Sequence, residues 1–240
     1  MLSAAALCPA PPLLARELTG AAAVLPELRQ ACRDAADALV QASPDVVAVV
    51  GVAAETRTWD ASARLDLSAY APGIRAGATG SSQASGTAAG PGSSLPLPLG
   101  LGCRLLDEAG YDGSLDLQSV SESTTATECA ALGARLAAAA RRVGLLIMAD
   151  GSARRSRRAP GYLDARSGTF DAEVGRAIRT GDMAALLALD PALARDLLAT
   201  GRPAWQVLAG AMDGSRPDSV IRYEDDPFGV AYLVASMTVS

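Results

Sequence analysis

The residues best able to do chemistry follow one short apolar run in the second half of the chain. Residues 143–149 are apolar and end at Asp150, after which come Gly151-Ser152-Ala153 and the arginines Arg154, Arg155, Arg157 and Arg158. A carboxylate directly after a buried run indicates an acid delivered to the carboxyl edge of a parallel sheet, where open α/β sheets bind ligands. Asp150 is therefore the candidate catalytic residue, and the candidate ligand-binding residues are Asp150, Ser152, Arg154, Arg155 and Glu224.

Each of these side chains also has a purely structural interpretation. Asp150 either belongs to a site or caps its own turn by accepting backbone hydrogen bonds. Glu224 is either a second carboxylate of that site or part of a solvated turn that runs to Asp226. Ser152 is not expected to be a nucleophile, because it lacks both the Gly-x-Ser-x-Gly elbow and a neighbouring base.

The arginine patch over residues 154–158 leaves two interpretations open. It can clamp the carboxylate or phosphate of an anionic ligand, since guanidinium groups bind such groups in pairs of hydrogen bonds. It can equally lie in a solvated loop and pair with Asp164, Asp171 and Glu173. A pocket open to solvent and lined by Asp150 and arginines would favour an enzyme or a binding protein, and a pocket filled by apolar side chains would favour a scaffold.

Two missing residue types limit the chemistry more than any residue that is present. The sequence contains no histidine and no lysine, so Ser-His-Asp triads, Cys-His dyads, Ser-Lys dyads and Schiff-base chemistry are excluded. The two-histidine-one-carboxylate iron site and the common zinc sites also need imidazole. The four cysteines form no CxxC pair, which argues against a zinc ribbon and fits reduced thiols in a cytoplasmic protein.

Length and charge place the chain among acidic globular proteins. Its 240 residues suit one domain over 1–240, half of the residues are hydrophobic, and only 4% are aromatic, so an aliphatic core is expected. The net charge of −5 argues against a nucleic-acid partner. The apolar start over residues 1–8 has no basic residue and soon meets prolines, so we expect a first strand there and neither a signal peptide nor a membrane span.

The elements that must position Asp150 follow from periodicity. Residues 2–8 and the continuous apolar run 46–52 indicate buried strands, with a helix from Pro26 between them, so the order predicts a right-handed β-α-β unit. Gly, Ser, Ala and Thr dominate the segment that follows, and we expect a mobile loop over 76–94, either a lid or a tolerated insertion.

The second half continues the alternation and then becomes helical. Strands are expected over 115–120 and 143–149, and a late pair over 219–223 and 230–237 joined by the turn 224–229. Helices are expected over 100–109, 124–142 (capped by Ser123 or Thr124), 170–180, 183–189 and 203–212, with a further one beginning at Asp190-Pro191. The predicted fold is a three-layer α/β domain with a central, mostly parallel sheet flanked by helices.

Four segments in this order resemble the class III extradiol ring-cleavage dioxygenases of the LigB type and the related Memo-like proteins. They are the first-strand turn Cys8-Pro-Ala-Pro-Pro-Leu-Leu14, the second strand after Pro44-Asp45, the turn Ala149-Asp-Gly-Ser-Ala153, and C-terminal pieces that include Leu187-Ala-Leu-Asp-Pro191 and Pro227-Phe-Gly-Val-Ala-Tyr232. The resemblance implies the LigB-like α/β fold, a homodimer or a second type of chain as partner, and ferrous iron held by two histidines and a glutamate, with a further histidine as acid/base.

The departures from the family pattern fall on its chemistry. By position, the first iron ligand becomes Ala10, the second becomes Ala53 or Ala54, and the acid/base becomes Ala153. We therefore expect no iron cofactor and no ring cleavage, and a small-molecule binding or interaction role with an anionic or aromatic molecule as the partner. The alternative is an enzyme that acts on an anionic substrate through Asp150 and the arginine patch, with a hard divalent metal such as Mg²⁺, Ca²⁺ or Mn²⁺.

Overall fold

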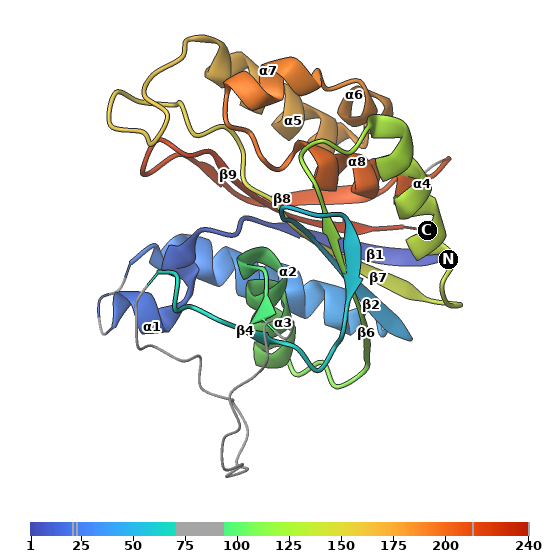
Figure 1. Cartoon of the computed structure of the whole chain (residues 1–240). Coiled ribbons are helices and arrows are strands. Elements are labelled where there is room, and N and C mark those ends of the chain that lie inside the picture. The colour runs from blue at the N-terminus through green and yellow to red at the C-terminus, as the bar shows by residue number, and fades with distance from the viewer. Residues whose placement is uncertain (21, 23, 71–93, 213, 240) are drawn as a thin grey trace.

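A seven-stranded sheet forms the centre of the molecule, in the order β3-β6-β2-β7-β1-β9-β8 (Figure 1). The computed structural model describes residues 1–20, 22, 24–70, 94–212 and 214–239. The strands of the sheet are β1 (Leu2–Cys8), β2 (Val46–Val52), β3 (Arg57–Trp59), β6 (Ser114–Val120), β7 (Val143–Met148), β8 (Asp218–Asp225) and β9 (Tyr232–Thr238). A separate parallel pair joins β4 (Arg64–Leu65) to β5 (Ser94–Leu95).

The four central strands are parallel, and the strands at both edges are antiparallel. β7 pairs in parallel with β1 on one side and with β2 on the other, and β2 pairs in parallel with β6. β3 and β9 add to this block in the antiparallel sense, and β8 pairs antiparallel with β9. Every residue of β7 is buried, as its uninterrupted apolar sequence requires of a strand covered on both faces.

Helices cover both faces of the sheet, which confirms the predicted three-layer α/β fold (Figure 1). One layer holds α2 (Pro26–Gln41) and α3 (Leu97–Glu108), with α1 (Arg16–Thr19) and the 3₁₀ turn Pro12–Leu14 beside them. The other holds α4 (Ala126–Ala137), α5 (Arg166–Thr180), α6 (Met183–Leu187), α7 (Pro191–Asp196) and α8 (Arg202–Ala211). Two aliphatic clusters fill the spaces on the two sides of the sheet.

Helices α4 and α8 pack with their backbones almost in contact. A Cβ at Gly133 would lie 2.0 Å from the carbonyl oxygen of Val207, and one at Gly210 would lie 2.3 Å from that of Ala130. Only glycine permits so close an approach of two helices. The buried Arg202 strengthens the same junction, since its guanidinium donates hydrogen bonds to the carbonyls that precede α4.

The predicted helix caps are confirmed in the C-terminal half. Asp182 accepts a hydrogen bond from the amide of Ala185 at 3.1 Å, and Asp190 accepts one from Ala192 at 2.8 Å. Gly181 ends α5 with a left-handed φ of 69°.

Several predicted boundaries were wrong. α4 begins after a capping box at Thr125, not at Ser123 or Thr124, and it ends at Ala137. The expected continuation to Arg142 fails because the Arg142 amide donates to the carboxylate of Asp45 at 2.8 Å. α3 begins three residues earlier than expected, at Leu97.

The segment after β2 contains structure that the sequence did not indicate. β3 and β4 form there because they pair with distant strands, and such pairing leaves no local periodicity. Of the loop predicted over 76–94, all but Ser94 lies outside the described residues. No helix within the described residues is long and apolar enough to cross a membrane.

Candidate functional site

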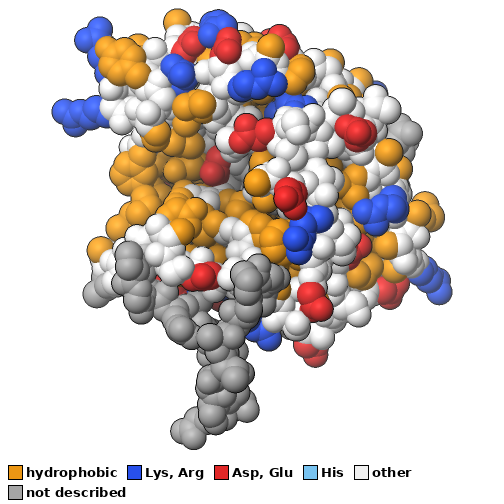
Figure 2. Space-filling model, viewed as in Figure 1, with side chains coloured by type: hydrophobic (Ala, Val, Ile, Leu, Met, Phe, Trp, Pro, Cys, Tyr) orange, Lys and Arg blue, Asp and Glu red, His pale blue; other side chains and the backbone are white. Residues whose placement is uncertain are grey.

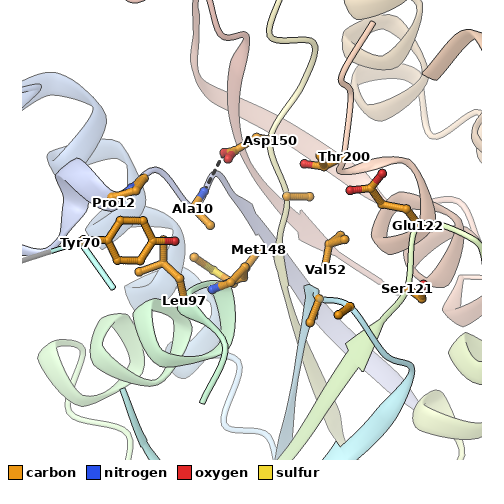
Figure 3. Close-up of a pocket in the computed structure, with 14 residues that line it drawn as sticks. Ala10, Pro12, Val52, Tyr70, Leu97, Ser121, Glu122, Met148, Asp150 and Thr200 are labelled. Atoms are coloured by element: carbon orange, nitrogen blue, oxygen red, sulfur yellow. Dashed lines mark hydrogen bonds between the residues drawn. The ribbon is translucent and has the colours of Figure 1, made fainter. Parts of the chain in front are cut away.

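A pocket of about 470 Å³ opens at the carboxyl edge of the four parallel strands. Most of the residues that line it have apolar side chains, and hydrophobic side chains surround the hollow on this face (Figure 2). The residues after β1, β2, β6 and β7 all reach it, together with residues from the helical layers: Ala10, Pro12, Val52, Ala53, Ala54, Tyr70, Leu97, Pro98, Ser121, Glu122, Met148, Ala149, Asp150 and Thr200 (Figure 3). This is the place where parallel α/β sheets bind ligands.

Asp150 lies in this pocket directly after β7, as the sequence predicted. One of its carboxylate oxygens accepts a hydrogen bond from the Ala10 amide at 2.8 Å (Figure 3). Burial raises the pKa of Asp150 to about 6, and the Ala10 amide opposes that shift only in part. No arginine lines the pocket among the described residues, so the ionised carboxylate has no cation to stabilise it there.

The hypothesis that Asp150 caps its own turn is wrong. The Gly151 amide donates to the carbonyl of Ala231 at 2.8 Å, and the Ser152 amide donates to Asp171 at 2.9 Å. The turn is therefore held by β9 and α5, and the Asp150 carboxylate instead ties the end of β7 to the loop after β1. Its structural role is one long-range hydrogen bond, which leaves the rest of the carboxylate facing the pocket (Figure 3).

The opposite wall holds a second carboxylate, Glu122, which the sequence analysis missed. Glu122 follows β6 as Asp150 follows β7, with Ser121 beside it, and Thr200 lies between the two acids (Figure 3). The signal was available, because the rule that selected Asp150 also applies to the strand predicted over 115–120. Arg202 fixes this wall by donating to the carbonyl of Glu122 at 2.5 Å.

The predicted arginines do not reach the Asp150 pocket. Arg155 lines a separate pocket of about 210 Å³ together with Glu224 and three further acids, Asp171, Asp225 and Asp226. Its Nε atom lies 2.7 Å from Asp226 and 3.8 Å from Asp171, so its charge is paired within the chain. The solvated-loop interpretation is thus confirmed for its pairing with Asp171, whereas Asp164 pairs with Arg166.

The remaining predicted residues, Ser152, Arg154 and Glu224, do not line the Asp150 pocket. Ser152 is fully buried and its hydroxyl donates to Asp171, so it is closed to a substrate. Arg154 lines neither pocket, and its backbone carbonyl accepts from the Ser167 hydroxyl at 3.0 Å. Glu224 does not lie in a turn: it is part of β8, opposite Leu233, and it forms an ion pair with Arg179 at 2.6 Å.

Two of the three positions that the resemblance assigns to histidine meet at one place: the first, Ala10, and the second, for which Ala53 and Ala54 are the alternatives. Ala10, Ala53 and Ala54 line the same pocket as Asp150, although Ala10 follows β1 and the other two follow β2. Ala153 lies outside it, and its amide donates to the carbonyl of Leu197 at 3.0 Å.

The residues of this pocket do not fit ferrous iron of the family type. They offer two carboxylates and no nitrogen ligand, because the chain has no histidine. The described residues also contain no group of three or more acid or thiol side chains arranged to hold a metal ion.

Comparison with known proteins finds likeness in fold only. No protein-family model matches the sequence, and no curated protein matches it. Among solved structures, the chain is similar to an uncharacterized protein, JW3007 from Escherichia coli K12, with a TM-score of 0.50 and 14% identity. The match covers 98% of this chain and 99% of that one, so the likeness extends over the whole three-layer architecture.

Proposed function

We propose that this chain is a small-molecule binding protein built on a fold like that of the class III extradiol dioxygenases, and that it neither holds iron nor opens aromatic rings. One observation supports the proposal above the others. Ala10 and either Ala53 or Ala54, which stand where the resemblance places the family's two iron-binding histidines, line the same pocket as Asp150. The cavity has kept its place at the sheet edge, while the side chains that would perform the chemistry are methyl groups.

The cavity itself suits a small organic ligand. Its volume of about 470 Å³ falls in the range of small-molecule sites, which are mostly apolar with a few polar groups that orient the ligand. Here the polar groups are the carboxylates of Asp150 and Glu122 and the hydroxyls of Ser121, Tyr70 and Thr200. The apolar walls supply affinity, and the carboxylates supply orientation.

Catalysis remains the second candidate, and one property of Asp150 favours it. A carboxyl whose pKa is raised to about 6 can exchange protons near neutral pH, as general acids and bases do. Such an enzyme would have to act without the arginine patch, because Arg155 faces the other pocket and is paired with Asp226.

Anaerobic reconstitution with ferrous iron tests the proposal against the family's activity. We expect no iron to remain after desalting, and no oxygen uptake with protocatechuate or catechol, because an all-oxygen site prefers harder ions and no side chain is placed to move the substrate proton. The Asp150→Ala variant is the matched control. Near-stoichiometric iron, or catechol-dependent oxygen uptake that this variant loses, would show that the pocket is an active iron site.

A further inference from the structure

We propose that the ligand of the Asp150 pocket is an organic cation: a small, largely apolar molecule with one protonated amine that binds the Asp150 carboxylate. This inference rests on the proposed binding function and adds the chemical class of the ligand.

The charges around the pocket all have one sign. Asp150 and Glu122 are its two ionisable acids, and its described lining contains no arginine. The guanidinium of Arg202 does not line the pocket: it donates to the backbone carbonyls of Glu122 and Thr124 and to the side chain of Gln206. An anionic ligand would therefore meet two carboxylates with no cation to offset them, which argues against the anionic partner expected from the sequence.

Of the two acids, Asp150 has the greater need of a cationic partner, because it is partly buried beside neutral groups. Facing it are the Ala10 amide after β1 and the phenol of Tyr232 at the start of β9. Burial, with a contribution from the charge of Asp150, raises the pKa of Tyr232, so this phenol stays neutral. An ammonium group would supply the missing countercharge and donate strong hydrogen bonds to the free side of the carboxylate.

The walls select an organic cation over a metal ion. No group of three or more acid or thiol side chains within the described residues is arranged to hold a metal ion, so a metal here would depend on two carboxylates and water. Pro12, Leu97, Met148 and Val52 instead offer apolar contact, and the Tyr70 ring at the rim offers a surface on which a cation can lie (Figure 3). A ring or short alkyl chain that carries an amine matches both features.

Three probes that share a phenylethyl group and carry a cationic, a neutral or an anionic head group test the inference: phenethylamine, phenethyl alcohol and hydrocinnamate. Each is titrated into the full chain at pH 8 and followed by protein-observed NMR. We expect the amine to bind most tightly, and we expect Asp150→Asn to weaken it by about tenfold or more, as loss of a charged hydrogen bond does. Asp37→Asn on the exposed face of α2 is the matched control and should leave binding unchanged.

The outcomes separate this inference from the proposed function. If the alcohol or the acid binds as tightly as the amine, in a manner that Ala54→Trp at the pocket rim abolishes, the pocket binds small molecules but the cationic class is wrong. If none of the three binds at millimolar concentration, both proposals are contradicted. Amine binding that survives Asp150→Asn would also overturn the assignment to Asp150.

The pH dependence of binding gives a readout that a purely structural aspartate would not produce. The amine stays protonated from pH 8 to pH 5, whereas Asp150 takes up a proton as the pH falls through about 6. Affinity for phenethylamine should therefore fall over this range, and affinity for the alcohol should not. An unchanged amine affinity at pH 5 would contradict the inference.

Discussion

Two acidic pockets lie on either side of the Gly151 turn, and they treat their carboxylates differently. In the smaller pocket, Asp171 accepts two hydrogen bonds from Ser152, and Asp226 pairs with Arg155 at 2.7 Å. In the larger pocket, Asp150 accepts one backbone hydrogen bond, and no guanidinium of the described residues lines the pocket with it. In the smaller pocket the acids Asp171 and Asp226 are paired with side chains of the same protein, whereas in the larger pocket no described side chain of opposite charge pairs with Asp150.

This difference shows that an acidic residue near a pocket indicates a ligand site only when the groups that pair with it are also known. A buried carboxylate without a cation lowers the stability of the folded protein. Such a group therefore indicates a functional site more strongly than a paired carboxylate does. The sequence shows both sets of acids and the arginines but not which of them meet. Pairing is thus the property that separates the binding pocket from the structural cluster.

The largest effect should come from the satisfied cluster. Asp171→Ala leaves the buried Ser152 amide and hydroxyl without acceptors, and we expect a loss of about 2–4 kcal/mol in the free energy of unfolding, measured by urea denaturation. Glu173→Ala, on the exposed side of the same helix, is the control. A loss for Asp171→Ala no larger than that of the control would remove the contrast between the two pockets.

A smaller effect of opposite sign should come from Asp150. The folded protein holds the Asp150 proton more tightly than the unfolded chain, so ionisation of this group lowers stability as the pH rises from about 4 to about 6. Asp150→Asn keeps an acceptor for Ala10 and removes the charge, so we expect it to stabilise the fold by about 1 kcal/mol at pH 8 and to change little at pH 4. Thermal melts at the two pH values measure this, and destabilisation at pH 8 would mean that the charge is already compensated.

The smallest effect is expected at the rim of the smaller pocket. Glu224 pairs with Arg179, but both side chains are about half exposed. Exposed ion pairs contribute little, so Glu224→Gln should cost less than about 1 kcal/mol and should lose even that in high salt. A double-mutant cycle with Arg179→Gln isolates the pair, and a coupling well above that value would place Glu224 among the structural acids with Asp171.

The fold was largely predictable from the sequence because its central strands are continuous apolar runs. The strands expected over 2–8 and 46–52 match β1 and β2 to the residue, and the run 143–149 differs from β7 by one residue. Helices marked by caps were also found, since Asp182 and Asp190 act through short-range hydrogen bonds. β3 and β4 were missed because their partners are distant in sequence.

The sequence predicted where the candidate site lies but not which residues line it. Asp150 was found because the end of a buried strand fixes where its side chain lies, and Glu122 was available to the same rule. Arg155 was misplaced because sequence adjacency says nothing about direction: the chain turns after Gly151, and the guanidinium lies against β8 and α5. Asp171 was noted only as a possible partner of the arginines, although it holds the turn itself.

The close contact of α4 and α8 bears on how the pocket discriminates between ligands. Glu122 lies just ahead of α4 and Thr200 just ahead of α8, and the glycine contacts and Arg202 join these helices into one body. We therefore expect the spacing between these two residues to change little if a ligand enters the pocket. On the other side of the pocket, Leu97 begins α3 in the other helical layer and Tyr70 lies in the turn after β4, and neither residue belongs to this junction. We therefore expect the side formed by Glu122 and Thr200 to limit the length of a ligand. Ligands of different width would be accommodated by movement of the side formed by Tyr70 and Leu97.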